Sequence, residues 1–380
     1  MKVSMKHCED YDFIRIKEII NSQINSLGGI NKFVKPGEKV LLKPNLVMKK
    51  NPEAAATTHP VIVKAIASLL IDYGASVVIG DSPGGPFTAG MLNGIYKATG
   101  MEQVANETGA TLNQNFGSFK MENPDGLIMK NLTLADMLND VDKVICIAKL
   151  KTHAMMTYTG AVKNMFGLVP GIIKGKYHLN KPGYDAFSDA LIDICIASKP
   201  VLSIIDGIVG MEGNGPTAGT PVKTNAILIS ESPYHLDFVA CKLIGLKPED
   251  VPLLKRLIER KIALFEDIEL TCDNYDVFKS NPYKIPPKQK SMADLSNPKI
   301  PRFIRTFVTR CLMTRPFFDK KICNGCGVCK ESCPVNIIEI KNNQASLDYR
   351  DCIRCYCCQE LCPRKAINVK KPFLSKLMRL

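Results

Sequence analysis

The sequence predicts an α/β fold, a largely parallel sheet or sheets covered by helices, followed by a small C-terminal α+β domain. Short apolar runs alternate with helical patterns over residues 1–271, which is the pattern of βαβ units. Nine of the 15 cysteines then fall between Cys323 and Cys362, where the composition changes. A chain of 380 residues has room for two or three domains.

The first predicted unit covers residues 38–79. Its first strand is the apolar run that begins at Glu38 and is closed by Pro44. Pro60 opens a helix with one apolar face, Gly74 ends it, and a buried strand runs to Ile79. Further strands, each followed by a loop and a helical pattern, are predicted at Val144–Ala148, Val201–Ile205 and Ala226–Ile229.

Polar segments follow four of these apolar runs. Ligands of parallel sheets bind outside the carboxyl ends of the strands, so these segments are the candidate site. They are Lys43-Pro44-Asn45, Asp81-Ser82-Pro83-Gly84-Gly85, Lys149-Leu150-Lys151-Thr152-His153 and Asp206-Gly207.

Two cysteine runs in the C-terminal part both fit C-x2-C-x2-C-x3-C-P. Three thiolates at this spacing can hold one iron–sulfur cube, and the fourth crosses to the other cube. The first predicted cluster is therefore held by Cys323, Cys326, Cys329 and Cys362, and the second by Cys352, Cys355, Cys358 and Cys333. Cys357 fits neither set. A pair of zinc ribbons is the alternative, although zinc sites usually separate two C-x2-C pairs by a longer gap.

This doubled run resembles the bacterial-type ferredoxin with two [4Fe–4S] clusters, over about residues 318–370. The expected division is an α/β domain at 1–271, a linker and basic helix at 272–317, and a two-cluster ferredoxin domain with a basic tail at 318–380. The resemblance implies low-potential one-electron transfer, an unidentified redox partner protein and an anaerobic cell.

Several phrases in the large domain resemble the DUF362 family, over about residues 1–270. They are Leu42–Val47, Thr57–Pro60, Gly80–Gly85, Lys149–His153 and Thr159–Gly167. The family often carries a ferredoxin module and has no generally established activity. A shorter segment is similar to the nickel-pincer lactate racemase, through His153, Gly160 and Lys163. That resemblance implies a metal-dependent racemase or isomerase as one alternative.

The same residues suggest a chemistry of their own. Lysine and asparagine side chains suit an anionic ligand such as a carboxylate or phosphate, and the predicted ligand-binding residues are Lys43, Asn45, Lys149, Lys151 and Asn164. The predicted catalytic residues are His153, Lys163, Asp81 and His59, with the histidines transferring protons. Turn and helix-cap chemistry is the alternative for Asp81 and His59. His7, His178 and His235 are expected to be structural or on the surface.

Three functions remain open at this stage. The first is an iron–sulfur oxidoreductase component that acts on a small anionic ligand, the second is an electron carrier with a non-catalytic docking domain, and the third is the racemase-like enzyme.

The glycines from Gly210 to Gly219 are one residue off a dinucleotide fingerprint, and Pro216 interrupts it, so a structured loop is expected there.

The positive charge of the chain and its position limit the classes of partner that are expected. Residues 301–380 hold 16 Lys+Arg and 6 Asp+Glu, so +10 of the net +13 lies there, around the cysteine runs. No nucleic-acid recognition motif accompanies it, and nucleic acid is not expected as a partner. The basic segment 301–316 and the basic tail are expected to form a solvated face in preference to a membrane contact. With no secretory signal and no long apolar span, a cytoplasmic location is expected.

Overall fold

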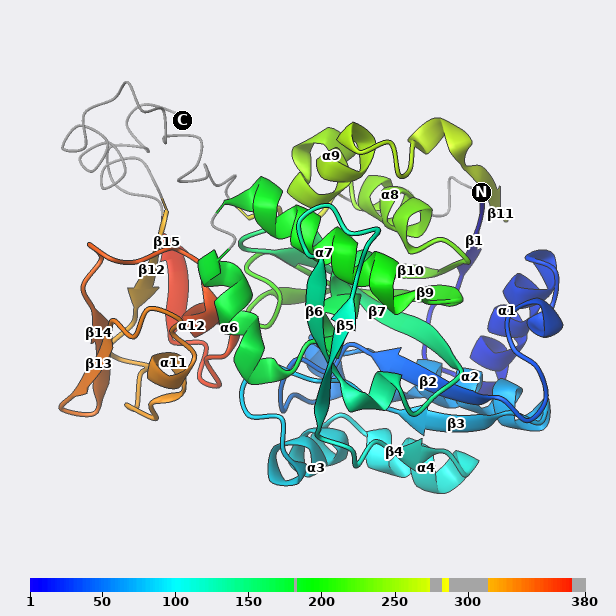
Figure 1. Ribbon diagram of the computed structural model, residues 1–380, viewed down its shortest axis with the longest axis horizontal. Coiled ribbons are helices and arrows are strands. Elements are labelled where there is room, and N and C mark those ends of the chain that lie inside the picture. Colours follow the sequence, from blue (N-terminus) through cyan, green and yellow to red (C-terminus); the bar gives the residue numbers. More distant parts are fainter. Residues whose placement is uncertain (181–182, 274–281, 287–313, 371–380) are drawn as a thin grey trace.

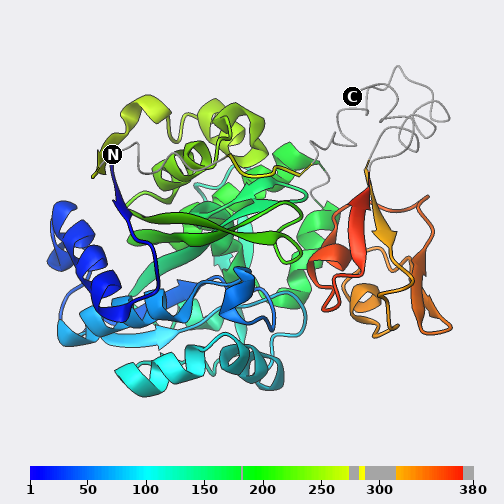
Figure 2. The ribbon, with the colours of Figure 1, turned by 180° about the vertical axis from the view of Figure 1, so that it is seen from behind.

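The computed structural model describes residues 1–180, 183–273, 282–286 and 314–370. These residues form two units, an α/β domain and a small C-terminal domain that packs against one end of it (Figure 1). Seen from behind, the C-terminal domain again lies beside α6 (Gly171–Asn180), far from the N-terminus (Figure 2). The α/β fold with a separate cysteine-rich domain is confirmed.

A mixed sheet forms the centre of the α/β domain. Within the described residues it has nine strands, in the order β11-β1-β10-β9-β7-β2-β3-β4, and β8 pairs with β7. Their bounds are β1 Lys2–His7, β2 Lys39–Pro44, β3 Ser76–Ile79, β4 Thr111–Leu112, β7 Lys143–His153, β8 Thr157–Thr159, β9 Leu202–Glu212, β10 Thr220–Ser230 and β11 Glu269–Cys272. A separate two-stranded ribbon pairs β5 (Ser118–Glu122) with β6 (Asn131–Ala135).

The middle of the sheet is parallel, as the alternating pattern predicts. β4, β3, β2, β7 and β9 pair in parallel, and the buried runs of β2 and β7 match strands covered on both faces. The pattern missed two antiparallel hairpins, β7–β8 and β9–β10. Because of them, Lys149–His153 and Asp206-Gly207 lie inside strands, whereas the sequence predicted loops after shorter strands.

The glycine-rich segment 210–219 is the turn of the β9–β10 hairpin. A strand follows it, where a dinucleotide-binding loop would lead into a helix. The expectation of a structured loop therefore fits the fold, and Gly215 lies so close to β7 that an added Cβ would stand 2.0 Å from the Thr152 carbonyl oxygen.

Two groups of helices cover the sheet. One group holds α1, α2, α3 and α4, and the other holds α5, α7, α8 and α9; they lie on opposite sides of the strands (Figures 1 and 2). Their bounds are α1 Phe13–Ser26, α2 Pro60–Asp72, α3 Ala89–Ala98, α4 Met101–Thr108, α5 Ala161–Asn164, α7 Tyr184–Ser198, α8 Pro233–Leu243 and α9 Pro252–Glu259. Short 3₁₀ helices lie at Ile30–Lys32, Pro52–Ala54, Asp136–Leu138, Met165–Leu168, Pro248–Asp250 and Phe265–Asp267.

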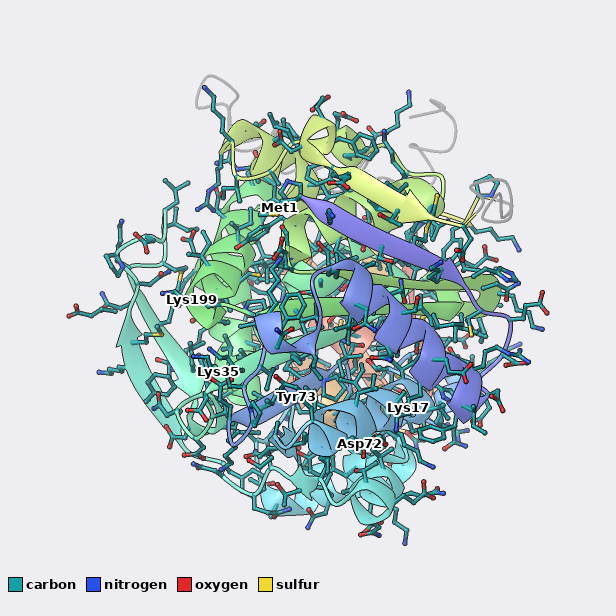
Figure 3. All side chains as sticks on the ribbon, turned by 90° about the vertical axis from the view of Figure 1, so that its right-hand side faces the viewer. Met1, Lys17, Lys35, Asp72, Tyr73 and Lys199 are labelled. Atoms are coloured by element: carbon teal, nitrogen blue, oxygen red, sulfur yellow. The ribbon has the colours of Figure 1, made fainter. Side chains whose placement is uncertain are left out.

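Local sequence sets the ends of these helices. Asp12 caps α1, because its carboxylate accepts the backbone N–H of Arg15 at 2.9 Å. His59 caps α2 by accepting the N–H of Val61, and Pro60 takes the first helical position as predicted. Lys17 of α1 pairs with Asp72 of α2 at 2.7 Å on the exposed face shown in Figure 3.

The C-terminal domain consists of short elements. β12 (Arg315–Phe318) pairs with β15 (Ile367–Lys370), β13 (Ile338–Lys341) pairs with β14 (Gln344–Leu347), and two one-turn helices lie between, α11 (Val328–Glu331) and α12 (Cys357–Glu360). β12 thus pairs within this domain from Arg315 on, ahead of the expected boundary at residue 318. Most of the expected linker and basic helix at 272–317, and the basic tail from residue 371, lie outside the described residues.

Among the described helices, none combines the length and the apolar character that a bilayer crossing requires.

A buried ion pair joins two central strands of the sheet. Lys149 of β7 and Asp206 of β9 stand in register, and their charged atoms are 2.8 Å apart. Asp206 also accepts the Tyr11 hydroxyl and the backbone N–H of His59, each at 2.9 Å. Both side chains are at most 2% exposed, so each charge depends on the other.

Replacing Asp206 by Ala should lower the free energy of unfolding by about 3–5 kcal/mol, because the Lys149 ammonium would remain buried without a carboxylate. Urea unfolding of the anaerobically prepared protein, followed by circular dichroism, measures this loss. Asp72→Ala is the matched control: it breaks an exposed ion pair and should cost less than about 1 kcal/mol. Equal small losses for both variants would contradict the assignment.

Candidate functional site

A cavity of about 680 Å³ lies where the α/β domain meets the C-terminal domain. Its α/β side comes from the ends of β2 and β7, the loop after β3, α5 and α6. Its other side comes from the α11 and α12 regions. The predicted site residues that line it are Lys43, Asn45, Asp81, Lys151, Lys163 and Asn164. Six of the nine side chains predicted from the α/β sequence therefore converge on one space.

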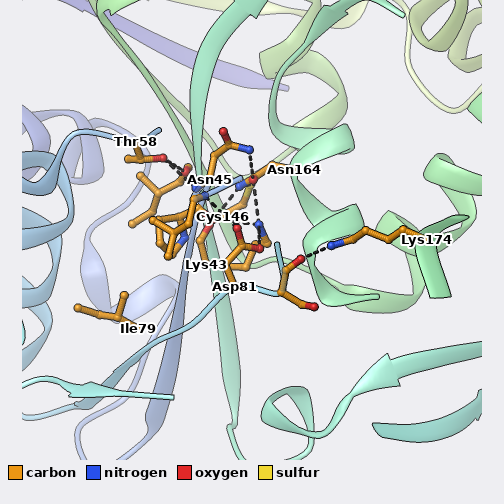
Figure 4. Close-up of polar contacts among 12 residues, drawn as sticks. Lys43, Asn45, Thr58, Ile79, Asp81, Cys146, Asn164 and Lys174 are labelled. Atoms are coloured by element: carbon orange, nitrogen blue, oxygen red, sulfur yellow. Dashed lines mark hydrogen bonds and ion pairs between the residues drawn. The ribbon is translucent and has the colours of Figure 1, made fainter. Parts of the chain in front are cut away.

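Lys43, Asp81 and Asn164 form the floor of this cavity (Figure 4). The Lys43 ammonium is 2.7 Å from Asp81 Oδ1 and donates to Asn164 Oδ1 at 2.9 Å. The other oxygen of Asp81 accepts the N–H of Leu46 at 2.9 Å. The side-chain amide nitrogen of Asn164 donates to the Lys43 carbonyl and to the thiol sulfur of Cys146. This network fixes the Lys43 ammonium and the Asn164 side-chain amide in place.

Gly167 makes the floor network possible. A Cβ at this position would stand 2.1 Å from Asp81 Oδ1 and 2.3 Å from Lys43 Nζ. Any larger residue would push the ion pair apart, which explains the glycine that ends the Thr159–Gly167 phrase.

Lys151 is buried, and within the described residues it has no carboxylate partner. It is 1% exposed and donates to Asn45 Oδ1 at 2.6 Å, the Ala56 carbonyl at 2.8 Å and the Pro216 carbonyl at 3.4 Å. Burial, with Lys163 and Lys149 close by, lowers the pKa of Lys151 well below its usual range. Neutral acceptors satisfy its N–H groups but leave its charge uncompensated.

Lys163 and Lys174 add two more cations to the same space. Burial lowers the pKa of Lys163, and Glu360 partly opposes this shift. Burial lowers the pKa of Lys174 to about 7, although Asp81 works in the opposite direction. The Lys174 ammonium donates to the Ser82 carbonyl and lies 5.6 Å from the centre of the Phe166 ring (Figure 4). The sequence analysis did not single out Lys174.

Glu360 of α12 is the main polar contribution of the C-terminal domain. One carboxylate oxygen is 3.0 Å from His153 Nε2. Burial alone would raise its pKa, but His153, Lys163 and His178 hold it at about 2. The hydroxyl of Thr217 donates to the Glu360 carbonyl at 2.7 Å, and Gln359 donates to the Asn214 carbonyl at 3.1 Å. These three polar contacts between the domains all come from one turn of helix.

His153 lies beside Glu360 and does not line the cavity. Nδ1 accepts the backbone N–H groups of Met155 and Met156 at 3.1 and 3.2 Å, which places the ring proton on Nε2, facing Glu360. Burial lowers the pKa of His153 to about 4, so the ring is neutral at pH 7. In this arrangement it orients Glu360 and the domain interface, and its predicted catalytic role stays a prediction.

The structure places His59 and Lys149 in a second cluster, apart from the cavity. The His59 ring stacks on Tyr11 with centroids 3.5 Å apart, and burial lowers its pKa to about 4. Lys149 bonds to Asp206 and to the Tyr11 hydroxyl. The helix-cap alternative for His59 thus describes its contacts, and its proton-transfer role stays a prediction.

Around the cysteine runs, one small cavity is lined by the first predicted ligand set. Cys323, Cys326, Cys329 and Cys362 line one small cavity together. The N–H of Ala345 donates to Cys323 Sγ and that of Ala366 to Cys362 Sγ, each at 3.3 Å, as expected around cluster thiolates. Cys333, of the second set, lines the large cavity together with Cys357. In the described part of the chain, no three His, Cys, Asp or Glu side chains form a site for a single metal ion.

The sequence assigned no site role to the cavity residues Lys174, Glu360 and Cys357, and His178 was expected to be structural or on the surface. Lys174 and His178 lie within helix α6, so the rule of strand ends could not select them. Glu360 and Cys357 lie in the other domain, and only the packing of the two domains brings them to the site. Tyr11, in the second cluster, was also missed, because its segment carries no motif.

Comparison with known proteins gives three findings. A family model described as a domain of unknown function, DUF362, matches residues 40–242, and one described as a 4Fe-4S dicluster domain matches residues 315–363. The thylakoid-associated protein sll1697 of Synechocystis is 34% identical over 284 residues, 72% of this chain and 86% of that protein. The lactate racemase apoprotein from Thermoanaerobacterium thermosaccharolyticum aligns with a TM-score of 0.40 and 12% identity, over 63% of this chain and 56% of that one, which carries no argument about activity.

Replacing His178 by Phe should flatten the acid dependence of stability. Burial lowers the pKa of His178 to about 4, so the unfolded chain binds this proton first as pH falls below about 6.5. The contribution of His178 to the free energy of unfolding is therefore fully present above about pH 6.5. Below that pH it falls by up to about 1.4 kcal/mol per pH unit. Anaerobic urea unfolding at several values between about pH 7 and 5.5 measures the slope.

Tyr177→Phe is the matched control on the same helix, because Tyr177 also contacts the Phe166 ring and the change removes no group that titrates in this range. It should keep the slope of the parent protein. An unchanged slope in the His178 variant would contradict the assignment.

Proposed function

The chain belongs to the DUF362 family and carries a 4Fe-4S ferredoxin domain, and we propose that it is an iron–sulfur oxidoreductase component acting on a small anionic ligand bound between the two. The proposal includes two [4Fe–4S] clusters with the ligand sets assigned above. It also includes a separate redox protein as partner, which exchanges electrons at the cluster that bears the exposed Cys326.

One observation carries the proposal: lysines of the α/β domain and a ligand cysteine of the second cluster line the same cavity. Lys151 and Lys163 form one side, and Cys333 forms part of the other. A non-catalytic docking domain has no need for a buried, uncompensated ammonium beside a redox centre, because such a charge destabilises the fold. Uncompensated charge is expected where a ligand completes the site.

The residues around the cavity have distinct roles in this proposal. Lys151, Lys163 and Lys174 hold the anionic group, while Asp81 fixes Lys43, which in turn bonds to Asn164. Lys174, with a pKa of about 7, is placed to give or take a proton at its Nζ atom. When bound, the clusters accept and donate single electrons at low potential. The C-terminal domain supplies one wall of the cavity.

The carrier hypothesis remains the main competitor. In it, electrons pass only between the ferredoxin domain and an external protein, and the cavity is a by-product of packing. The racemase-like hypothesis receives less support, because His153 Nδ1 accepts two backbone N–H groups and Nε2 faces the Glu360 carboxylate at 3.0 Å. We propose a cytoplasmic location in an anaerobic cell; the thylakoid association is a property of the Synechocystis relative.

Anaerobic reconstitution should load about eight iron and eight sulfide per chain. Cys358→Ser should lose about half of the iron, because it removes a ligand of the second cluster. Cys357→Ser is the matched control on the adjacent residue and should keep all of it. Iron and acid-labile sulfide assays with electron paramagnetic resonance measure this. Zinc in place of iron, or one cluster at full loading, would contradict the assignment.

Inorganic phosphate should bind the reconstituted protein, and Lys163→Met should weaken binding about tenfold or more, the cost of one charge-assisted hydrogen bond. Calorimetry measures the affinity. Phosphate should also alter the resonance spectrum of the reduced protein, because the cavity borders Cys333. Lys97→Met, on the exposed face of α3, should change neither result. If phosphate neither binds nor alters the spectrum, the carrier hypothesis is favoured.

A further inference from the structure

The charges inside the cavity do not balance. Each of Lys43, Lys151, Lys163 and Lys174 lies within electrostatic reach of at least one other, and the two carboxylates among them are Asp81 and Glu360. Lys43 is paired with Asp81 and Glu360 lies against His153, whereas Lys151, Lys163 and Lys174 have no ion pair among the described residues. When all four lysines are protonated, these side chains carry an excess of two positive charges, counted without the charge of the clusters. The other charged lining residues, Lys49, Lys176 and Glu331, are exposed.

Two polar atoms of the cavity wall have no partner within the described part of the chain. Ser82 Oγ is fully buried, and His178 Nδ1 belongs to a ring that is 9% exposed. Unsatisfied polar atoms are costly in a protein interior, so such atoms beside a cavity indicate groups that a ligand completes. Both residues line the same cavity as the three unpaired lysines.

The rest of the wall is apolar. Its larger apolar side chains are Met48, Met91, Ile95, Phe166, Leu179 and Leu361. A cavity of about 680 Å³ exceeds what a bare phosphate or a small carboxylate fills, and it matches the size of sites for larger organic ligands. Methionine side chains adapt to an apolar group of varied shape.

From these features we propose that the cavity binds an amphipathic organic dianion: a doubly negative head held by Lys151, Lys163 and Lys174, joined to an apolar body along the methionine-lined wall. The head is a phosphate monoester or a pair of neighbouring carboxylates, and Ser82 and His178 bond to its polar atoms. This inference rests on the proposed function, since it specifies the ligand of the same site.

Binding of such a head should be linked to proton uptake. Without a ligand, burial and neighbouring cations lower the pKa values of Lys151 and Lys174. The charged groups that face them are Lys43, Lys149, Lys163, Asp81 and Glu360, and their balance is positive. A dianion raises the pKa of both ammoniums, so protons enter the site with it.

The test compares three probes on the reconstituted holoprotein by calorimetry. Phenyl phosphate carries two charges and an apolar body, inorganic phosphate lacks the body, and benzoate lacks the second charge. Phenyl phosphate should bind at least about tenfold more tightly than either. At about pH 8, titrations in buffers of different ionisation enthalpy should show uptake of up to about one proton per bound phenyl phosphate, and less in Lys174→Met.

Variants of the cavity wall test separately how the charged head and the apolar body of the ligand are bound. Met91→Ser should reduce the preference for phenyl phosphate over inorganic phosphate and leave phosphate binding unchanged, whereas Lys97→Met should alter nothing. Three results would overturn this inference. They are equal affinities for phenyl phosphate and inorganic phosphate, equal affinities for phenyl phosphate and benzoate, and an affinity for phenyl phosphate that neither Lys174→Met nor Met91→Ser changes. If phosphate alone still bound in a Lys163-dependent way, the proposed function would survive; if no anion bound, both would fail.

Discussion

The burial of lysine ammonium groups at the carboxyl ends of β2 and β7 is the constraint on which this structure depends. Lys43, Lys149 and Lys151 are each at most 2% exposed, in a setting where an unpaired charge costs several kcal/mol. Asp81 neutralises the first and Asp206 the second. These two carboxylates also bind backbone N–H groups of Leu46 and His59, so compensating the charge also fixes the loops around the site.

The same requirement explains how the two domains fit together. α12 is a single turn of helix, yet it supplies Cys358, a predicted cluster ligand, and Glu360, the carboxylate that enters the lysine-rich cavity. The backbone carbonyl of Glu360 and the side chain of Gln359 bond to the β9–β10 hairpin. The position of the cluster ligands is therefore coupled to the cavity through one short element. A negative group from the C-terminal domain lowers the charge imbalance without removing it.

The sequence alone predicted the α/β class, the starts of several elements and most of the cavity floor. Lys43, Asn45, Asp81 and Lys151 could be found because a parallel sheet places the ends of its strands together. The hairpins could not be found, since β7 and β9 continue through polar residues whose burial depends on partners far along the chain. Lys174, His178 and Glu360 were missed for the same reason: their roles arise from the packing of α6 and α12 against strand ends, and no local pattern encodes that packing.

Lys149 and Lys151 show what strand register adds to sequence. They are two residues apart on β7 and so face the same side of the sheet, and the sequence gives no ground for separating them. In the structure, Lys149 stands opposite Asp206, but the pairing with β9 then shifts, and Lys151 stands opposite Met211. Met211 supplies no carboxylate, so the pairing of these strands leaves the charge of Lys151 without the neutralising partner that Lys149 has. One lysine is consequently bound into the fold, while its neighbour keeps an uncompensated charge at the cavity, where an anion can complete it.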